Sequence, residues 1–297
     1  MKWSIEQIPS LKGKNIVITG ANSGIGFEAA KVFAAKGGNV ILACRNTEKG
    51  QSALNAIKEA TPDANLTLLP LDLASLDSVT AFSQQVAQTW DHLDILVNNA
   101  GVMAPPLSRT AEGFEMQFGT NHLGHFALTG KLLPLLEKSD DARIVVVSSL
   151  AHRFGRINFS DLNSEKRYLR WPAYAQSKLA NLMFAKELQR RLQKQGSSVV
   201  TCAAHPGYSS TELQRYVPGN SLFNSLLSQT QAQGCLPTLY AATAPDIKGG
   251  EYIGPDGFFE VKGNPKRASS TKRANNPEIA DRLWQVSEKL TQVSYLS

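Results

Sequence analysis

The sequence is short of the features that mark secreted, disulfide-bonded or membrane-spanning proteins. Its cysteines, Cys44, Cys202 and Cys235, are odd in number and widely spaced, which argues against a disulfide framework and for a reducing compartment. The longest apolar runs, such as 144–147, are far too short to cross a bilayer. Residues 1–6 contain no apolar segment of the signal-peptide type. These absences predict a cytoplasmic protein with no transmembrane segment.

Dense charge and metal-ligand patterns are also missing. The chain carries a net charge of +6, but the basic clusters at 166–170 and 262–273 are interspersed with other residues. They are typical of a solvated surface rather than a nucleic-acid interface, and they are compatible with weak peripheral contact with an anionic membrane. The histidines lack ligand spacing with cysteines or acids, so we expect no metal site. His122 and His125 are expected to be packed or hydrogen-bonded.

What the sequence does contain is an alternation of apolar strands and helices. Its hydrophobic content of 42% and charged content of 19% are those of a globular protein with a sizeable core. The patterns predict strands at 15–19, 39–43, 66–71, 93–97 and 143–148, and helices at 27–36, 75–90 and 114–136. Such alternation predicts an α/β fold with a doubly wound parallel sheet and ligands at the carboxyl ends of its strands. Polar side chains fall at or near those ends: Thr19, Arg45, Asp72, Asn98, Ser148 and Ser149.

A glycine-rich turn, 20–26, joins the first strand to the first helix with the spacing GxxxGxG. Such a turn offers free N–H groups and a helix dipole to a pyrophosphate, although a plain glycine-rich turn remains the alternative. The second strand is followed by Arg45, and the acid that would bind the 2′-hydroxyl of NAD is absent there. A guanidinium suits a 2′-phosphate, which favours NADPH over NADH unless Arg45 is simply a surface residue.

Tyr174 and Lys178 are four residues apart and lie on one face of a predicted helix. A neighbouring ammonium favours the phenolate, so we expect Lys178 to lower the pKa of Tyr174. A tyrosine of that kind can exchange a proton with an alcohol or carbonyl near neutral pH. A surface tyrosine beside a solvated lysine is the structural alternative, because the pattern is short.

Several motifs occur together and in order: Thr19-Gly-Ala-Asn-Ser-Gly-Ile-Gly26, Asn98-Asn-Ala-Gly101, Asn121, Ser149, Tyr174-xxx-Lys178 and Pro206-Gly207-xxx-Thr211. Over nearly the whole chain they resemble the short-chain dehydrogenase/reductase superfamily. The segments 42–46, 121–126 and 161–168 are similar to its retinol dehydrogenase branch, which neighbours the protochlorophyllide reductases and the WW-domain oxidoreductase. The resemblance implies a Rossmann-type fold and one domain over 1–297. Its cofactor-binding part would span about 12–205.

The resemblance also implies residue roles. Tyr174 would donate the proton in reduction, Ser149 would hold the carbonyl oxygen, and Lys178 would bind the nicotinamide ribose. Asn121 would hold a water that links Lys178 to solvent. NADP(H) would be contacted by Tyr174 and Lys178 and by a further set of residues: Gly20, Asn22, Ser23, Gly24, Ile25, Gly26, Arg45, Asp72, Leu73, Asn98, Ala100, Gly101, Pro206, Gly207 and Thr211. Ser149 is preferred to Ser148 on family alignment.

Two segments are expected to line the substrate pocket: 152–172, which is rich in aromatic and basic residues, and a lid over 208–233. Their apolar residues suggest a lipophilic substrate, unless they merely pack the lid to the body. The C-terminal part, 250–295, predicts a strand at 250–254 and a helix capped by Asn276. That helix begins at Pro277, with an apolar face of Ile279, Leu283, Val286, Leu290 and Val293.

The apolar run Leu182, Phe184, Leu188 and Leu192 reads most simply as a core face, with a homo-oligomer contact as the alternative. Taken together, the sequence predicts reversible reduction of a lipophilic aldehyde or ketone, such as retinal, by NADP(H). A protochlorophyllide-type reductase is one rival, although no group of cysteines lies near the lid. The other is a catalytically silent NADPH-sensing interaction protein, which would need only the glycine-rich turn and Arg45.

Overall fold

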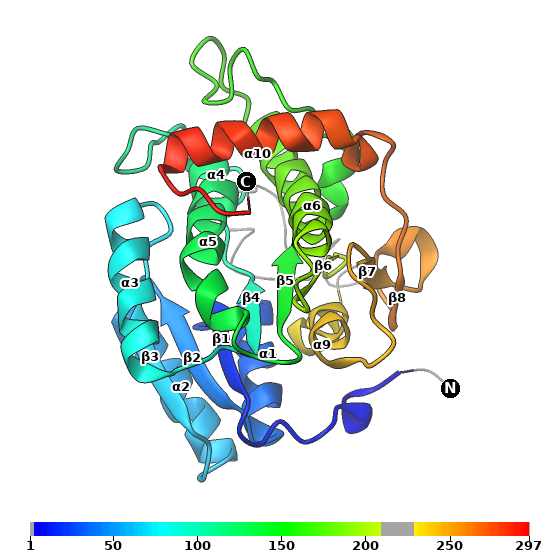
Figure 1. The fold of residues 1–297 in the computed structure, drawn as a ribbon. Helices are drawn as coiled ribbons and strands as arrows, with labels where there is room; N and C mark the ends of the chain where they lie inside the picture. Colours follow the sequence, from blue (N-terminus) through cyan, green and yellow to red (C-terminus); the bar gives the residue numbers. More distant parts are fainter. Residues whose placement is uncertain (1–2, 209–228, 297) are drawn as a thin grey trace.

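A single eight-stranded sheet forms the centre of the computed structural model, which describes residues 3–208 and 229–296 (Figure 1). The strand order is β3-β2-β1-β4-β5-β6-β7-β8, and all neighbours are parallel except the pair β7 and β8. The strand order reverses between β1 and β4, which creates a switch point at that edge of the sheet. The strands are Asn15–Thr19 (β1), Asn39–Cys44 (β2), Leu66–Pro70 (β3), Ile95–Asn98 (β4), Arg143–Val147 (β5), Val200–Ala204 (β6), Tyr252–Pro255 (β7) and Pro265–Arg267 (β8).

Helices cover both faces of this sheet (Figure 1). One face packs against Gly24–Ala35 (α1), Thr47–Ala60 (α2) and Leu236–Thr243 (α9). The other packs against Leu76–Thr89 (α3), Gly124–Leu136 (α5), Arg170–Lys194 (α6) and Pro277–Thr291 (α10). Shorter helical segments connect them: Ile5–Gln7, Met116–Phe118 (α4), Gly119–Leu123, Leu150–Phe154, Gln231–Gly234 (α8), Phe258–Glu260 and Arg273–Asn275.

The central strands β1, β4 and β5 are buried on both sides, and their apolar residues run without alternation. In β1, the side chain of Val17 joins the core on one face, whereas Ile16 and Ile18 join the core on the other. All three are fully buried. A parallel sheet covered by helices on both faces requires this pattern, which confirms the predicted doubly wound architecture.

The predicted elements differ from the observed ones mainly at their ends and at one interruption. Helix α1 begins at Gly24, inside the glycine-rich turn, rather than at Phe27. The single helix predicted over 114–136 is divided into α4, a π-helical turn at Gly119–Leu123 and α5. Helix α2 was not predicted, because its buried face is narrow and the rest of it is polar.

The C-terminal helix α10 lies across the ends of α5 and α6 (Figure 1). It begins at Pro277, and Asn276 caps it by accepting a hydrogen bond from the backbone N–H of Ile279 at 3.0 Å, as predicted. Of the predicted apolar face, Leu283 is fully buried, and Ile279, Leu290 and Val293 are partly exposed but pack against the core. The helix is rotated so that Trp284 packs against aromatic side chains of α5 and α6, and the buried stripe is Ala280, Leu283, Trp284, Ser287 and Thr291.

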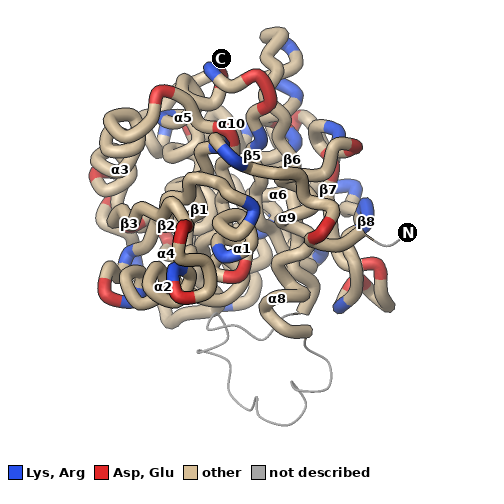
Figure 2. Tube along the Cα trace, turned by 90° about the horizontal axis from the view of Figure 1, so that it is seen from below, with Lys and Arg blue, Asp and Glu red and all other residues tan. Residues whose placement is uncertain are grey.

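The sequence raised the possibilities of a homo-oligomer contact on α6 and of contact with a membrane. The α6 run Leu182, Phe184, Leu188 and Leu192 is buried within the chain, so it is core and is inaccessible to a second subunit. Along the chain trace of Figure 2, Lys and Arg positions are interspersed with Asp and Glu positions. None of the described helices is both long and apolar enough to cross a bilayer.

Candidate active site

One cavity of about 540 Å³ lies at the carboxyl ends of β1, β2, β4 and β5. A volume of this size suits a small-molecule or cofactor site. It brings together most of the predicted site residues: Gly20, Asn22, Ser23, Gly24, Ile25, Gly26, Arg45, Asp72, Leu73, Ala100, Gly101, Ser149, Tyr174, Lys178, Pro206 and Gly207. Asn98 and Asn121 do not line it, and Thr211 lies outside the described residues.

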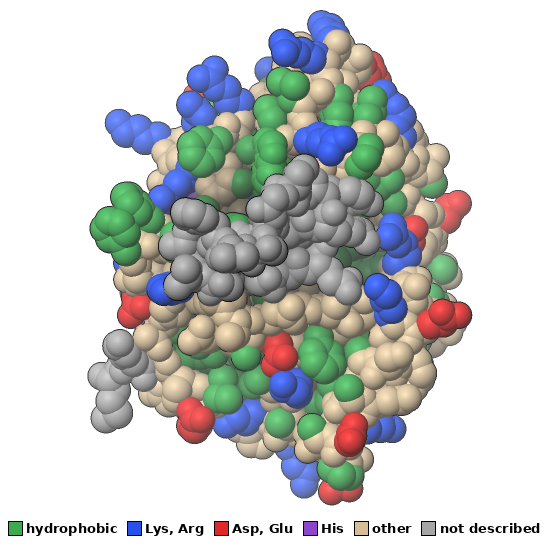
Figure 3. Space-filling model, turned by 180° about the vertical axis from the view of Figure 1, so that it is seen from behind, with side chains coloured by type: hydrophobic (Ala, Val, Ile, Leu, Met, Phe, Trp, Pro, Cys, Tyr) green, Lys and Arg blue, Asp and Glu red, His purple; other side chains and the backbone are tan. Residues whose placement is uncertain are grey.

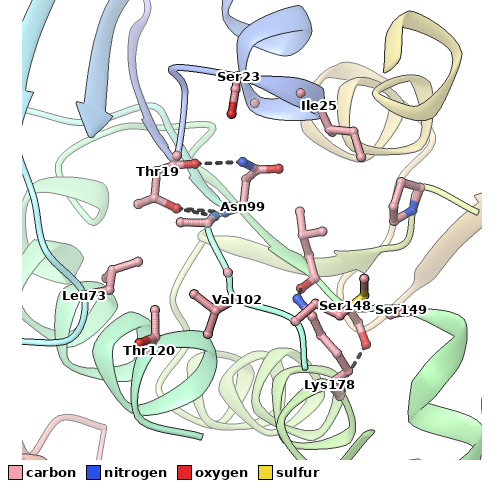
Figure 4. A pocket seen from close by; sticks show the side chains of 18 of the residues that line it. Thr19, Ser23, Ile25, Leu73, Asn99, Val102, Thr120, Ser148, Ser149 and Lys178 are labelled. Atoms are coloured by element: carbon pink, nitrogen blue, oxygen red, sulfur yellow. Dashed lines mark hydrogen bonds between the residues drawn. The ribbon is translucent and has the colours of Figure 1, made fainter. Parts of the chain in front are cut away.

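The glycine-rich turn forms one wall of the cavity, and Ser23 and Ile25 project from it (Figure 4). Gly20 and Gly24 have φ angles of 67° and 61°, which lie in the left-handed region that glycine tolerates best. At Gly26, a β-carbon would lie 2.4 Å from the carbonyl oxygen of Gly20, so only glycine allows α1 to start this close to the strand. The turn therefore presents backbone and a helix N-terminus to the cavity, as a pyrophosphate site requires.

Asn98 and Asn99 take opposite directions at the end of β4. Asn98 is fully buried and donates from Nδ2 to the hydroxyl of Thr129 at 2.9 Å. The Asn98 side chain therefore points away from the cavity, because adjacent side chains on a strand point to opposite faces, and its predicted contact with the cofactor stays a prediction. Asn99 lines the cavity instead and donates to the carbonyl oxygen of Thr19 at 2.8 Å (Figure 4).

The far end of the cavity is basic. Arg45 is exposed at the end of β2 and lines the cavity together with Asn46 and Lys49. Asn46 Oδ1 accepts a hydrogen bond from the backbone N–H of Lys49 at 2.8 Å and so caps α2. Lys49 was missed by the sequence reasoning, although its place four residues after Arg45 was a usable signal. Two cations at this position favour an anionic group on the ligand.

Ser149, Tyr174 and Lys178 meet at the opposite end. Tyr174 and Lys178 lie one turn apart on α6 and are only 6% and 4% exposed. Ser149 lines the cavity with Tyr174 and lowers the pKa of its hydroxyl, while the Lys178 ammonium donates to the carbonyl oxygen of Val147 at 3.2 Å. Ser148 donates its hydroxyl proton to the carbonyl oxygen of Lys178 at 2.7 Å, so the geometry favours Ser149 as the group available to a ligand.

The pKa values of this pair differ from the expectation. Burial raises the pKa of Tyr174 to about 12, and the neighbouring Ser149 hydroxyl offsets only part of that rise. Burial of the phenol outweighs the expected lowering by Lys178, whose ammonium lies 5.8 Å from the Tyr174 ring centre. Burial lowers the pKa of Lys178 to about 8.

Asn121 lies behind the cavity wall, in the π-helical turn. Its Oδ1 accepts from the N–H of Val102 at 2.8 Å, and its Nδ2 donates to the carbonyl oxygen of Val102 and to the hydroxyl of Ser177. A β-carbon on Gly101 would come within 3.0 Å of Asn121 Oδ1 and 3.5 Å of Lys178 Nζ. The side chain is thus beside Lys178, and its predicted water-holding role stays a prediction.

Apolar side chains border the reactive end of the cavity: Met103, Leu150, Trp171 and Tyr208. Trp171 is 52% exposed, and its ring is perpendicular to that of Tyr174 at 6.3 Å. On the face opposite to that of Figure 1, hydrophobic side chains lie exposed among Lys and Arg (Figure 3). Of the predicted lid over 208–233, residues 209–228 lie outside the described part of the chain.

A reversed strand order with a cavity at the switch point defines the dinucleotide-binding class of α/β proteins. The short chain dehydrogenase family model matches residues 14–220. Human retinol dehydrogenase 12 is 43% identical over 290 residues, covering 96% of this chain and 88% of that protein. The chain therefore belongs to the short-chain dehydrogenase family and is retinol dehydrogenase-like, which confirms the resemblance inferred from the motifs.

Solved structures agree with this assignment. An uncharacterised protein from Mycobacterium paratuberculosis is 42% identical with a TM-score of 0.84, and 99% of each chain is covered. A protein described as a short-chain dehydrogenase from Escherichia coli CFT073, in complex with NADPH, is 28% identical with a TM-score of 0.67. That match covers 82% of this chain and 96% of the other. The protein is thus an oxidoreductase of a family that uses NAD(P)(H).

Proposed function

We propose that this protein is a single-domain, NADP(H)-dependent reductase that reversibly converts a lipophilic aldehyde or ketone to the alcohol. The observation that carries the proposal is the layout of one cavity. Ser149, Tyr174 and Lys178 meet at one end of it, and Arg45 with Lys49 stands at the other. A dinucleotide laid between these ends would have its adenosine phosphate near the cations and its nicotinamide near Tyr174.

Each residue of the reactive end has a role that its position supports. Ser149 would hold the carbonyl oxygen, since it lines the cavity together with Tyr174. Tyr174 keeps its proton at neutral pH and would give it to the oxygen as negative charge develops there. Lys178 would bind the nicotinamide ribose and stabilise the phenolate that remains. The cofactor supplies the hydride.

The cofactor preference rests on the second strand end. Arg45 is followed by Asn46 and then by Lys49 in the first turn of α2, and no acidic side chain takes the place where NAD-binding folds hold the ribose hydroxyls. A guanidinium can pair with both free oxygens of a 2′-phosphate. The set of side chains at this end therefore supports NADPH as the preferred cofactor.

The substrate class follows from the walls near Tyr174. Met103, Leu150, Trp171 and Tyr208 offer apolar and aromatic surface next to the reacting groups. A half-exposed tryptophan at the mouth suits an extended apolar chain rather than a charged metabolite. A relative named retinol dehydrogenase 12 agrees with a retinal-like carbonyl.

The proposal is tested by following nicotinamide absorbance after mixing the protein with NADPH or NADH and a panel of carbonyls. The panel contains retinal, a long-chain aldehyde and a small ketone. We expect oxidation of NADPH with the lipophilic members, and we expect Tyr174→Phe to reduce the rate at least about a thousandfold through loss of the proton donor. NADPH affinity should stay within about threefold.

Tyr240→Phe is the matched control. It removes a hydroxyl bonded to Asp246, outside the described cavity lining, and should keep the full rate. Turnover retained in Tyr174→Phe would refute the assignment of the proton donor. NADPH binding without turnover of any carbonyl would instead favour the sensor alternative, and a requirement for light would favour the protochlorophyllide-type alternative.

A further inference from the structure

The imidazole of His125 spans the space between the glycine-rich turn and the reactive end of the cavity. It stands in the first turn of α5 and is 1% exposed. Its Nε2 lies 2.9 Å from the hydroxyl of Thr19, at the end of β1. Its Nδ1 lies 2.9 Å from the backbone carbonyl oxygen of Asn121, in the π-helical turn. One ring therefore contacts both halves of the site.

The hydrogen bonds of Thr19 determine which ring nitrogen carries the proton. The Thr19 hydroxyl oxygen accepts the backbone N–H groups of Asn99 and Ala100, each at 2.9 Å. A hydroxyl has two acceptor positions and one proton, so its remaining bond must be a donated one. Nε2 of His125 is the nearer acceptor, since the carbonyl oxygen of Val97 is 3.4 Å away. Nε2 is thus unprotonated, and Nδ1–H donates to Asn121.

Other observations agree with a neutral ring. Burial, opposed by the hydrogen bond to Asn121 and aided by the nearby Lys178 ammonium, lowers the pKa of His125 to about 4. A protonated ring would leave the Thr19 hydroxyl facing an N–H donor, with only the distant carbonyl of Val97 to accept its proton. The neutral Nδ1–H form satisfies both nitrogens, as buried polar atoms require.

At its Thr19 end, the imidazole supports the cofactor side of the cavity. Asn99 and Ala100, held by the same hydroxyl, both line that side. Ala100 also lies against Gly20, where a β-carbon would come within 3.0 Å of the Ala100 backbone. Thr19 and Asn99 are seen next to each other beneath the turn in Figure 4.

At its Asn121 end, the imidazole supports the reactive side. The side chain of Asn121 holds both backbone groups of Val102, which lines the cavity, and it donates to Ser177. Ser177 in turn donates to the backbone carbonyl oxygen of Tyr174 at 2.8 Å. A displacement of the Asn121 backbone would therefore also move Val102 and Ser177, the residues that Asn121 holds next to Tyr174 and Lys178.

We propose that neutral His125 is a positioning residue, which uses its two ring nitrogens to hold the cofactor-binding turn and the catalytic residues at a set separation. The inference rests on the proposed function, because it assigns the two sides of the cavity to cofactor and chemistry. It goes beyond that function by giving a role to a histidine that touches neither ligand.

Two substitutions separate the two nitrogens. In His125→Asn, the amide N–H group replaces Nδ1–H toward Asn121, and the acceptor for Thr19 is lost. In His125→Gln, the longer side chain places an amide oxygen near Nε2, and the donor to Asn121 is lost. Loss of one partner of a buried hydrogen bond typically changes an equilibrium by about tenfold or more.

The expected result is therefore a crossed pattern. His125→Asn should weaken NADPH binding about tenfold with kcat within about threefold, and His125→Gln should lower kcat about tenfold with NADPH affinity within about threefold. Equal losses of both quantities in both variants would overturn the proposal and indicate a merely structural histidine. NADPH affinity is measured by energy transfer from protein tryptophans to the bound nicotinamide.

His122 provides the matched control. It belongs to the same motif, is equally buried, and its Nε2 lies 2.8 Å from the hydroxyl of Ser287 on α10, away from the cavity. His122→Asn and His122→Gln should lower the unfolding midpoint while leaving kcat and NADPH affinity near their wild-type values. A crossed pattern in the His122 variants as well would overturn the assignment to His125.

A spectroscopic measurement tests the proposal without turnover. Long-range proton–nitrogen NMR of the histidine-labelled protein reports which ring nitrogen is protonated, and the His125→Asn spectrum identifies the signal. We expect a neutral ring with the proton on Nδ1 from pH 6 to pH 8, whereas a proton on Nε2 would overturn the inference. If no carbonyl is reduced, the proposed function fails. The tautomer and the NADPH affinities of the two variants still decide the role of His125.

Discussion

Burial shifts the pKa values of Tyr174 and Lys178 in opposite directions. The neutral form is favoured in both cases, so the pKa of the phenol rises to about 12 and that of the ammonium falls to about 8. Tyr174 therefore holds its proton over the whole neutral range, as a donor in reduction must. The charge of Lys178 is the quantity that changes near physiological pH.

This difference predicts the pH dependence of reduction. As the pH rises through about 8, Lys178 loses its charge, and the rate of reduction should fall. Well above that pH, the rate should decrease about tenfold for each pH unit. Tyr240→Phe should show the same profile, because Tyr240 lies outside the described cavity lining. A rate that stays constant to pH 9.5 would contradict the assignment. The measurement is kcat/KM for an aldehyde as a function of pH, in buffers of constant ionic strength.

Deprotonation of Lys178 does not itself destabilise the fold. The pKa of Lys178 in the folded protein lies below its ordinary value of 10.5, so between about pH 8 and that value the unfolded chain binds more protons at this residue. The contribution of Lys178 to the free energy of unfolding therefore rises with pH over the same window. Activity and this part of the stability should move in opposite directions.

At the other end of the cavity, Arg45 is expected to select the cofactor. Arg45→Ala should weaken NADPH binding about tenfold or more, while NADH affinity changes by less than about twofold, because only NADPH carries the 2′-phosphate. Dissociation constants from nicotinamide fluorescence check this. Arg156→Ala, an exposed arginine outside the described lining of this cavity, is the control. Equal losses for both cofactors would refute a phosphate contact.

At the scale of elements, the division of the predicted 114–136 helix is the difference that matters for function. The π-helical turn Gly119–Leu123 displaces Asn121 from the regular spacing of α5 and places its side chain against Val102 and Ser177. Such turns often occur at functional sites. The apolar periodicity of this stretch shows a helix, but a single extra residue in one turn leaves that periodicity almost unchanged.

Helix α10 is a second element whose contribution can be measured. Asn276→Ala removes the side chain that caps its first turn and should lower the free energy of unfolding by about 1 kcal/mol. Asn276→Asp keeps an acceptor there and should remain close to wild type. Urea unfolding followed by circular dichroism gives both values. An Ala variant as stable as the Asp variant would show that the cap contributes nothing.

At the scale of the whole molecule, the sheet separates two hydrophobic cores, and the cavity lies at the sheet edge where both meet the loops. Turn, loop and helix residues from many parts of the chain converge there. A ligand that spans the cavity would thus contact segments from several distant parts of the chain at once.

This arrangement predicts that NADPH stabilises the fold as a whole. Because the unfolded chain has no site, NADPH at a hundredfold excess over its Kd should add about 2.7 kcal/mol to the free energy of unfolding. NADH at the same concentration should add less, since its affinity is expected to be lower. Calorimetry in the presence of each cofactor checks the order. An unchanged melting temperature with NADPH would contradict the assignment of the cavity.

The alternation of strands and helices was largely predictable from sequence, because apolar runs, glycines and helix caps act over short distances, although helix α2 was missed. The position of several residues in the cavity lining was predictable as well, since each follows a strand end or lies on one helix face: Gly20, Arg45, Ser149, Tyr174 and Lys178. The family resemblance assigned their roles. These are local patterns, and tertiary packing need not be known to recognise them.

Other features depend on which segments meet in space, and only the tertiary structure decided them. Asn98 turns into the core whereas Asn99 faces the cavity, because the exact end of β4 sets the direction of each side chain. The pKa of Tyr174 rises because segments far apart in the chain bury it. His125 joins Thr19 to Asn121 across more than a hundred residues of sequence, a contact that no local pattern records.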